Sequence, residues 1–488
     1  MPKSAVCLTK TNYLEGLECP KLLWYRYHRK YEIPPPSAEE REIIKQGQIV
    51  GALARQLFPS GIKIDWEYDP VRMDEKSFAR LNQRLPLFEA GLVYKKTYAQ
   101  GDILLPAENA AWDIVEVKST VQLKEENYYD AAFQKYVYEG RGLSIRHCYL
   151  MHINNQYVRK GKLEIDKLLI KDDITAGVDQ LLPEIDERVA AMLEMIAGPE
   201  PDTRVGKQCK DCPLHDFCWQ FLPEEHVFIL RGKNDVAFDL MERGILKMND
   251  IPDDYELTEK HSIQVKSHKA NSAFIDHDSL KIFLDKVEYP LYFLDFETIA
   301  PAVPVYDLTH PYQDIPFQFS LHRVEKEGAK PVHYAYLAPG DVDPRREVLT
   351  RLVKLLGDSG SILAYFAQYE KSVIKSLVAL YPEFTDWFEN TVNRFIDLYI
   401  PFQKLFYYHP GQHGSASMKM VLPALTGITY EGMEIGNGGM ARFEYMRVTF
   451  ENGVPAEERS RVRAALEKYC ELDTRGMIEI LQALKDAV

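Results

Sequence analysis

The segment YFLDFET, residues 292–298, most constrains how this chain can fold. Its residue types predict a β-strand, in which Asp295 and Glu297 are two positions apart and therefore share one face. The opposite face carries the apolar side chains of Tyr292, Leu294 and Phe296. Two like charges on a buried strand are unfavourable unless a partner neutralises them. The segment therefore predicts a strand with one face in a hydrophobic core and the other at a cation site.

A segment near the end of the chain supplies further groups that suit such a cation site. KYCELDT places Tyr469 and Asp473 four residues apart, on one face of a predicted helix. Two divalent cations about 4 Å apart can neutralise such carboxylates and hold a phosphate in line with an attacking water. The pattern therefore indicates phosphodiester hydrolysis.

DFET and YCELD resemble the first and last motifs of the DnaQ-like (DEDD) 3′→5′ exonucleases, the last motif in its tyrosine variant. The resemblance implies an RNase H-like mixed-sheet domain that uses Mg²⁺ or Mn²⁺. It assigns the metal ligands to Asp295, Glu297 and Asp473. It gives Tyr469 the task of positioning the attacking water.

The chain departs from this family in the middle of the pattern. Where family members have a helix-opening aspartate after a strand, this chain has Glu370. Three outcomes stay open: Glu370 replaces that ligand, Asp397 replaces it, or the RNase H-like fold carries an inactive site. We favour Glu370. Ser417 and Lys419 are candidate phosphate contacts, with a solvated loop as the alternative.

A second acidic pattern lies in the first half of the chain. In WDIVEVKST, Glu116 and Lys118 are two apart and share a strand face. Asp102 lies 14 residues before Glu116 on the predicted partner strand of a hairpin. Gln134 and Tyr138 share one face of the next predicted helix. Carboxylates can hold Mg²⁺ and a nearby lysine can orient water, although an ordinary salt-bridged edge strand is the alternative.

This order of an Asp, an ExK pair and a QxxxY helix resembles the RecB-like branch of the PD-(D/E)XK nucleases. The resemblance implies a restriction-endonuclease-like α/β core with Asp102 and Glu116 as metal ligands and Lys118 as the catalytic lysine. It assigns DNA-facing support to Gln134 and Tyr138. Family members often carry a further ligand on the first helix, and the candidates for it are Glu42 and Gln48.

Three of the seven cysteines crowd into CKDCPLHDFC, residues 209–218. An odd number of cysteines in a long chain argues against a disulfide framework, whereas this spacing predicts a metal site. Cys19, nearly two hundred residues upstream in LECPKLLWYRY, can supply a fourth thiolate and clip the first helix to the end of the domain. The remaining cysteines are expected to be small buried side chains: Cys7, Cys148 and Cys470.

An N-terminal Cys followed by Pro and aromatic residues, with C-x₂-C-x₅-C after the nuclease core, resembles the iron-staple nucleases. These include AddB and the CRISPR-adaptation exonucleases. The resemblance implies a [4Fe–4S] cluster on Cys19, Cys209, Cys212 and Cys218. Zinc is the alternative, and His215 is then a possible substitute ligand.

Length and composition bound the organisation of the chain. Its 488 residues predict two or three domains, and 46% hydrophobic with 27% charged residues is typical of globular proteins. We expect a RecB-like domain over 1–225, a helical connector over 226–286 and an exonuclease-like domain over 287–488. The start MPKSAVCLTK lacks the apolar core of a signal peptide, and no apolar run approaches about 18 residues. We therefore expect a cytoplasmic protein without a membrane partner.

Together these patterns predict an α/β nuclease that hydrolyses single-stranded or end-bearing DNA at two metal-dependent sites. A net charge of −14 gives no overall attraction for nucleic acid, so DNA contacts would depend on local basic patches. The pairing of the two halves also resembles an uncharacterised bacterial protein family, which supplies no function. The alternatives are a nucleic-acid-binding or scaffold protein with an inert DEDD half, and an exonuclease directed at RNA. No protein partner follows from the sequence.

Overall fold

The computed structural model describes residues 7–340 and 342–488. The expectation about a signal peptide rests on the N-terminal stretch MPKSAVCLTK. Residues 1–6, most of this stretch, lie outside the described residues. Among the described residues, no helix combines the length and apolar character needed to cross a membrane.

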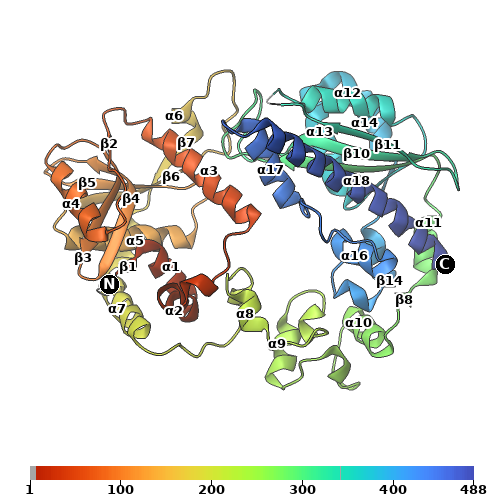
Figure 1. Ribbon diagram of the computed structural model, residues 1–488, viewed down its shortest axis with the longest axis horizontal. Helices are drawn as coiled ribbons and strands as arrows, with labels where there is room; N and C mark the ends of the chain where they lie inside the picture. The colour runs from red at the N-terminus through yellow and green to blue at the C-terminus, as the bar shows by residue number, and fades with distance from the viewer. Residues whose placement is uncertain (1–6, 341) are drawn as a thin grey trace. The chain divides into compact units, whose positions relative to one another are not determined.

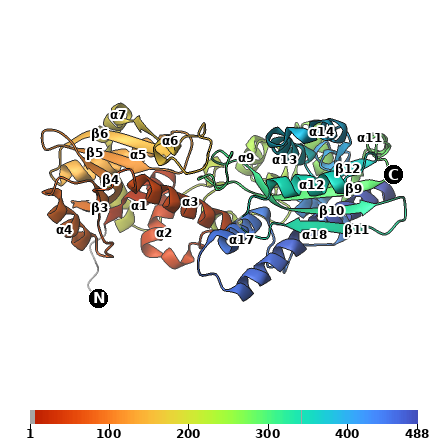
Figure 2. The ribbon, with the colours of Figure 1, turned by 90° about the horizontal axis from the view of Figure 1, so that it is seen from above.

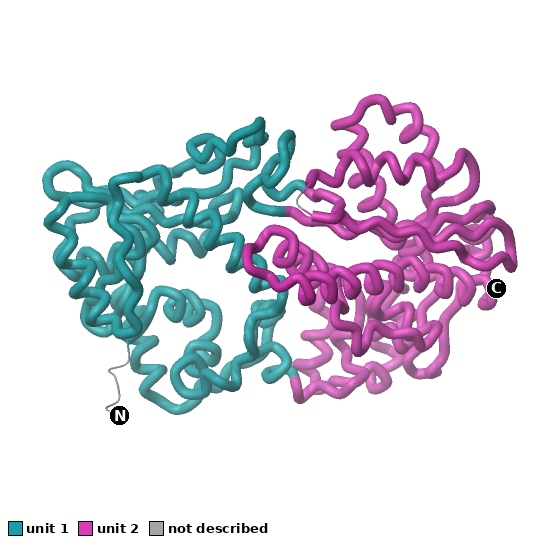
Figure 3. Tube along the Cα trace, turned by 45° about the horizontal axis from the view of Figure 1, so that its top comes forward, with its two compact units in different colours: residues 1–219, 301–313 teal, residues 220–300, 314–488 magenta. Residues whose placement is uncertain are grey.

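The described chain forms two compact units, each of mixed α/β structure (Figure 3). Unit 1 contains the described residues up to Trp219 together with Pro301–Gln313, and unit 2 contains Gln220–Ala300 and Asp314–Val488. The expected connector, residues 226–286, therefore belongs to unit 2 and is not a separate body. The expected domain over 287–488 is also not continuous, because its short segment Pro301–Gln313 packs within unit 1.

Unit 1 is built on a seven-stranded sheet of described residues, in the order β2-β3-β4-β5-β6-β7 with β1 beside β4. Its strands are β1 (Leu8–Thr9), β2 (Ile62–Lys63), β3 (Leu87–Tyr94), β4 (Thr97–Pro106), β5 (Trp112–Val117), β6 (Ile145–Ile153) and β7 (Leu169–Asp173). Its α-helices are α1 (Lys10–Glu18), α2 (Pro20–His28), α3 (Ala38–Arg55), α4 (Pro70–Leu81), α5 (Glu125–Gly140), α6 (Ile165–Leu168), α7 (Thr175–Ala197) and α8 (His215–Trp219). The 3₁₀ turns are η1 (Lys30–Glu32) and η2 (Lys207–Cys209).

Two cores lie on the two faces of this sheet. The helices that contribute to them, α3, α5 and α7, are labelled in Figure 1. Leu104 of β4 and Phe133 of α5 belong to the core under α5 and α7. Ile103, the neighbour of Leu104, belongs to the other core, with Val50 of α3. Successive strand residues point to opposite faces, so β4 contributes to both cores. The predicted hairpin is confirmed, because β4 and β5 pair antiparallel.

The segment Pro301–Gln313 is held in unit 1 by hydrogen bonds and apolar packing. The Ala302 N–H donates to Gln46 Oε1 at 2.8 Å, and Ala302 is buried in the α3 core. Arg159 Nη1 donates to the carbonyl oxygens of Pro304 and Val305, each at 2.9 Å. The Tyr312 hydroxyl donates to the carbonyl oxygen of Ser119, which directly follows Lys118.

Unit 2 is built on a five-stranded sheet of described residues in the order β11-β10-β9-β12-β13. Its strands are β8 (Phe274–Ile275), β9 (Leu291–Ile299), β10 (Ile315–Val324), β11 (Val332–Leu337), β12 (Ser361–Ala364), β13 (Phe395–Asp397) and β14 (Tyr407–Tyr408). Strands β11, β10 and β9 run antiparallel, whereas β12 is parallel to both β9 and β13. The short strands β8 and β14 pair separately.

The helices of unit 2 are α9 (Asp235–Glu242), α10 (Glu259–Ala270), α11 (His277–Leu284), α12 (Arg345–Leu355), α13 (Ala367–Leu380), α14 (Thr385–Val392), α15 (Ile400–Gln403), α16 (Met418–Thr426), α17 (Gly438–Phe450) and α18 (Ala456–Asp486). Its 3₁₀ turns are η3 (Val227–Ile229), η4 (Met248–Asp250), η5 (Pro382–Phe384) and η6 (Pro410–Gln412).

The sheet of unit 2 has an apolar and a polar face. Leu294 of β9 packs in a core with Leu352 of α12 and Ile374 of α13. The opposite face is covered by α18, where Gln318 of β10 donates its side-chain N–H to the carbonyl oxygen of Leu466 at 3.0 Å. Figure 2 shows α12 and α13 on one side of the strands and α18 on the other. The carboxylates predicted on β9 therefore face α18.

Candidate active sites

Three carboxylates of unit 2 converge on the polar face of the sheet. β9 supplies Asp295 and Glu297, whose shared face is confirmed, and α18 supplies Asp473. One ligand atom from each lies within 4.8 Å of the others, a spacing that can hold a metal ion. The apolar neighbours on β9 enter the core, which leaves the acids on the side that α18 covers.

Burial and mutual repulsion strongly perturb these carboxyl groups. Burial, together with Asp473, raises the pKa of Glu297 to about 8. Burial raises the pKa of Asp473 to about 7, although its hydrogen bond with Tyr430 opposes the shift. Burial and the charges of Asp473, Glu370 and Glu297 raise the pKa of Asp295. Without a bound cation, ionising all three carboxyl groups together is therefore unfavourable near neutral pH.

Glu370 lies beside this cluster on the first turn of α13. Its side chain is buried, and its Oε2 has no hydrogen-bond partner among the described residues. Burial and the charges of Glu297, Asp397 and Asp473 raise the pKa of Glu370. An unpartnered buried carboxylate near three others has the properties of a further cation ligand.

Asp397 has a different set of contacts. Its Oδ1 accepts backbone N–H bonds from Phe366 at 2.9 Å and from Tyr399 at 3.0 Å. Phe366 has a φ of 71° and precedes α13, so Asp397 holds the turn that presents Glu370. Neither Asp397 nor Glu370 is among the three carboxylates that lie within 4.8 Å of one another, so the choice between them rests on their other contacts. These contacts favour Glu370 over Asp397 as the fourth carboxylate.

Two tyrosines and a lysine lie at the α18 side of the cluster. The predicted Tyr469 lies next to Tyr430, with ring centroids 6.0 Å apart. The Tyr430 hydroxyl donates to Asp473 Oδ1 at 2.5 Å. Lys419 Nζ lies 6.0 Å from the Tyr430 ring centre and 5.9 Å from that of Tyr469. Lys419, predicted as a phosphate contact, is therefore near the carboxylates.

Sequence reasoning missed Tyr430 and Arg442. The charge of Arg442 acts to lower the pKa of Glu297, and its Nε donates to the carbonyl oxygen of Thr298 at 3.2 Å. Neither residue lies at a strand or helix spacing from Asp295, Glu297 or Asp473. No local sequence signal therefore identifies Tyr430 or Arg442. Ser417 is exposed at the start of α16 and accepts a hydrogen bond from the Ser415 hydroxyl at 3.0 Å.

The acidic pattern of unit 1 also converges. Asp102 Oδ2 accepts the backbone N–H of Val117 at 2.7 Å, which ties it to the strand that carries Glu116. Lys118 Nζ donates to Glu116 Oε1 at 3.0 Å. The structure therefore brings Asp102, Glu116 and Lys118 together across β4 and β5.

Lys10 and Asp130 complete this group, and sequence reasoning missed both. Lys10 Nζ lies 2.7 Å from Glu116 Oε1 and 2.9 Å from Asp130 Oδ1. Lys118 Nζ lies 2.6 Å from Asp130 Oδ2. Asp130 lies one helical turn before Gln134, so the helical spacing could have revealed it. Lys10 begins α1, far from the motif, and carries no such signal.

The lysines and acids of unit 1 shift one another's pKa. Burial and the charges of Asp102 and Asp130 raise the pKa of Glu116 to about 7. Burial acts to raise the pKa of Asp130, but Lys10 and Lys118 outweigh it and lower this pKa to about 2. Burial also raises the pKa of Asp102.

Gln134 and Tyr138 have a supporting position, and their predicted DNA-facing orientation is corrected here. Both side chains are fully buried. The Tyr138 hydroxyl donates to the carbonyl oxygen of Ala90 at 2.5 Å and accepts the Gly101 N–H at 3.0 Å. A Cβ on Gly101 would lie 1.7 Å from Gln134 Nε2 and 2.8 Å from the Tyr138 hydroxyl oxygen, so a larger residue there would displace both side chains.

The two candidates for a further ligand lie on α3. Gln48 is exposed, and Glu42 accepts a hydrogen bond from Gln46 Nε2 at 3.5 Å. Lys10 of α1, not a residue of α3, reaches Glu116.

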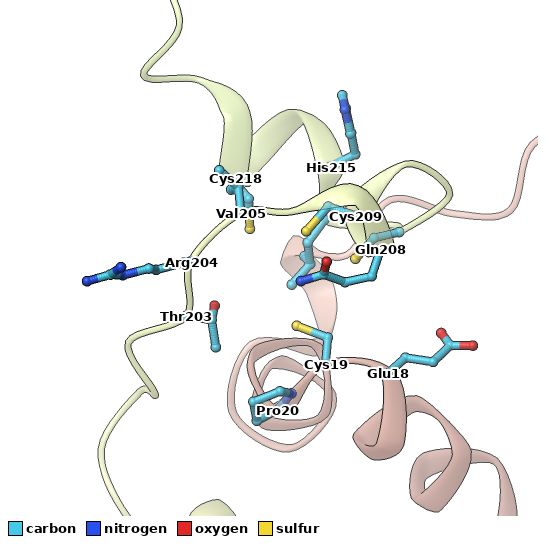
Figure 4. A pocket seen from close by; sticks show the side chains of 12 residues that line it. Glu18, Cys19, Pro20, Thr203, Arg204, Val205, Gln208, Cys209, His215 and Cys218 are labelled. Atoms are coloured by element: carbon cyan, nitrogen blue, oxygen red, sulfur yellow. The ribbon is translucent and has the colours of Figure 1, made fainter. Parts of the chain in front are cut away.

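Four cysteines line one pocket of about 250 Å³ in unit 1: Cys19, Cys209, Cys212 and Cys218. Figure 4 shows the sulfur atoms of Cys19, Cys209 and Cys218 directed into the same space, with His215 directed away. His215 Nδ1 lies 2.9 Å from Asp216 Oδ1. The four thiols therefore line one pocket, but they are not among the groups of described residues whose ligand atoms lie within 4.8 Å of one another.

The three remaining cysteines lie elsewhere. Cys148 and Cys470 are buried as expected, whereas Cys7 is only partly buried. Cys470 Sγ lies 3.7 Å from Asp295 Oδ2, beside the unit 2 carboxylates.

Two comparisons relate this chain to known proteins. Residues 292–417 match a family described as a domain of unknown function (DUF2779). An "Uncharacterized protein MG366 homolog" from Mycoplasma pneumoniae (strain ATCC 29342 / M129 / Subtype 1) is 24% identical over 232 residues. The similarity covers 43% of this chain and 34% of the relative, so the chain spans about a third of that relative's length. The matched domain includes Asp295, Glu297 and Glu370 but ends before Asp473.

Proposed function

We propose that this chain is a metal-dependent nuclease that hydrolyses DNA phosphodiester bonds as an exonuclease, on single-stranded or end-bearing substrates. The observation that carries the proposal is the convergence of Asp295, Glu297 and Asp473 within 4.8 Å in a largely buried setting. Like charges at this spacing require protons or cations, and an all-carboxylate donor set suits Mg²⁺ or Mn²⁺. The basic residues beside the cluster suit a phosphate.

In unit 2, Asp295, Glu297 and Asp473 would hold the cations, with Glu370 as the fourth carboxylate. Bound divalent cations supply charge for the phosphate oxygens and lower the pKa of an attacking water. Tyr469 would position that water, and Lys419 and Arg442 would attract the phosphate. The mixed sheet, three antiparallel strands followed by two parallel ones, supports an RNase H-like fold.

In unit 1, Asp102 and Glu116 would hold a cation and Lys118 would orient the attacking water. A cation at Glu116 competes with the ammonium of Lys10, which contacts the same carboxylate. Gln134 and Tyr138 act as positioning residues through β3 and β4. The antiparallel β4–β5 pair, with β6 parallel to β5, supports a restriction-endonuclease-like core.

The shared pocket supports a metal cofactor on Cys19, Cys209, Cys212 and Cys218. We propose a [4Fe–4S] cluster on the resemblance to iron-staple nucleases. Its part in this proposal is structural, because the cysteines join α1 and α2 to the α8 end of unit 1.

The proposal is tested with end-labelled DNA and RNA strands in Mg²⁺ or Mn²⁺, using wild type, Asp102→Ala and Asp295→Ala. Two working sites predict that each substitution removes one activity, by about 10²-fold or more, and leaves the other. Asp386→Ala, at an exposed position of α14, is the control and should cleave like wild type. Loss of all cleavage in a single variant rejects the two-site version. No metal-dependent cleavage by wild type supports a binding or scaffold protein, and a preference for the RNA strand supports an exoribonuclease.

The same assay decides between Glu370 and Asp397. Glu370→Gln should reduce the activity that depends on Asp295 by about 10²-fold, because a cation ligand loses its charge. Asp397→Asn keeps an oxygen that can accept the two backbone N–H bonds, so its activity should stay within about threefold of wild type. The reverse pattern would assign the metal ligand to Asp397.

A further inference from the structure

A second group of metal-ligating side chains lies in unit 2: His322, His333 and Glu471. One ligand atom from each lies within 4.8 Å of the others. Glu471 lies inside the YCELD segment without an assigned role there, none of the three residues belongs to the carboxylate cluster, and their role is independent of the proposed hydrolysis.

The strand pairing brings the two histidines together. His322 of β10 lies directly opposite His333 of β11 in an antiparallel pair, so both rings project from the same face. The rings stack with centroids 4.4 Å apart and planes at 21°. α18 covers this face and contributes Glu471, two residues before Asp473.

A pair of hydroxyl groups fixes one nitrogen of each ring. His322 Nδ1 lies 2.8 Å from Thr474 Oγ1, and His333 Nε2 lies 2.9 Å from Ser320 Oγ. The two hydroxyl oxygens are themselves 2.7 Å apart. Metal-bound histidines are held in this way, because a bond to one ring nitrogen orients the other toward the ion. Nε2 of His322 and Nδ1 of His333 are then the nitrogens left for a ligand.

The spacing and charge of the group fit a metal ion better than a direct ion pair. His333 Nδ1 and Glu471 Oε1 are 3.8 Å apart, too far for a hydrogen bond. Two donors at about 2.1 Å from a tetrahedral ion lie about 3.4 Å apart, close to the 3.8 Å between His333 Nδ1 and Glu471 Oε1. The two stacked rings must tilt apart before a nitrogen of each can face the same ion. Two imidazoles and one carboxylate suit Zn²⁺, whereas the neighbouring all-carboxylate cluster suits Mg²⁺ or Mn²⁺.

We propose that His322, His333 and Glu471 form a second metal site that binds Zn²⁺ and fastens α18 to β10 and β11. The site has solvent access, since the side chains of His333 and Glu471 are 28% and 49% exposed. Its ion stabilises the helix that also carries Tyr469 and Asp473, and it supplies no chemistry to the substrate.

The test measures Zn²⁺ binding and thermal unfolding of the full chain in excess Mg²⁺, with zinc per chain determined by elemental analysis. His333→Asn and Glu471→Gln change partly exposed positions and should fold. Each should bind one fewer zinc per chain than wild type, with at least a tenfold loss of affinity at this site. Zn²⁺ should raise the Tm of wild type by more than that of either variant.

Three controls make the result specific. Glu467→Gln, an exposed position one turn earlier on α18, and His277→Gln, exposed on α11, should bind zinc like wild type. Asp295→Asn should also retain this zinc, so failure of the hydrolysis proposal leaves this one standing. The proposal is overturned if His333→Asn and Glu471→Gln bind zinc with the same stoichiometry and affinity as wild type. It is also overturned if wild type shows no saturable zinc binding beyond that of the two variants.

Discussion

The protonation states of Glu297 and Asp473 depend on what surrounds them rather than on the residue types. Each lies among other acids, with Lys419 as a nearby cation that acts against the upward shifts. The ordinary pKa values of 4.5 and 3.8 become about 8 and about 7. The metal-free cluster is therefore stable when it holds protons and unstable when it loses them.

This arrangement predicts that metal-free protein loses stability as the pH rises. A carboxyl whose folded pKa is raised contributes stability that is fully present below its unfolded pKa and lost as the pH rises through its folded pKa. For Glu297 and Asp473 this interval runs from about pH 4 to about pH 8. Thermal unfolding in a chelator should therefore give a lower Tm at about pH 8.5 than at about pH 5.5, and Mn²⁺ should reduce the difference.

Two variants separate this effect from other titrating groups. Glu297→Gln cannot ionise, so its Tm should fall less over the same pH interval. Glu389→Gln, an exposed position on α14, should fall as wild type does. An equal pH dependence in all three proteins would contradict the predicted role of Glu297.

Among the elements, α5 acts as a brace for β3 and for β4, the strand that carries Asp102. Gly101 lets α5 approach β4 closely, and Tyr138 bonds to the backbone of both β3 and β4. Asp130 projects from the same helix to the two lysines. Through these contacts α5 fixes the position of the strand that carries Asp102.

Tyr138→Phe should destabilise the protein by about 1–3 kcal/mol, because buried backbone groups of Ala90 and Gly101 lose a hydrogen-bond partner. Urea unfolding measures this change in the free energy of unfolding. Tyr68→Phe serves as the control, because its side chain is largely exposed and should change stability by less than about 0.5 kcal/mol. Equal stability of Tyr138→Phe and wild type would remove the bracing role.

At the scale of the whole molecule, the cysteine pocket joins chain segments that are nearly two hundred residues apart. Cys19 lies between α1 and α2, whereas the other three cysteines lie at the end of the continuous part of unit 1. A cofactor that bonds all four closes a long loop and should stabilise unit 1.

Cys209→Ser should therefore lose the cofactor and lower the Tm, whereas Cys7→Ser, outside the pocket, should keep both. The measurements are visible absorbance, iron and zinc content, and thermal unfolding of protein purified without oxygen. A brown protein with broad visible absorbance and iron supports [4Fe–4S]. A colourless protein with one zinc per chain would replace the cluster by zinc, and neither metal would reject a cofactor at this pocket.

Local spacing predicted much of the fold and part of the candidate sites. The two-residue spacing of Asp295 and Glu297 and the four-residue spacing of Tyr469 and Asp473 follow from strand and helix geometry. These elements form as predicted. The β4–β5 hairpin and the grouping of the four cysteines were also predicted from the sequence.

Other members of the sites have no such local signal. Lys10 reaches Glu116 from 106 residues away, and Tyr430 reaches Asp473 from 43 residues away. The choice between Glu370 and Asp397 likewise depends on backbone contacts that hold Asp397 in a turn.

The sequence by itself determined which residues share a face of a strand or helix, because backbone geometry imposes those periodicities over a few residues. Only the tertiary structure decided which faces meet, that Pro301–Gln313 packs within unit 1, and that His322, His333 and Glu471 converge. The physical reason is that these contacts arise from the packing of distant elements, and packing depends on the shapes of whole side-chain surfaces rather than on spacing along the chain.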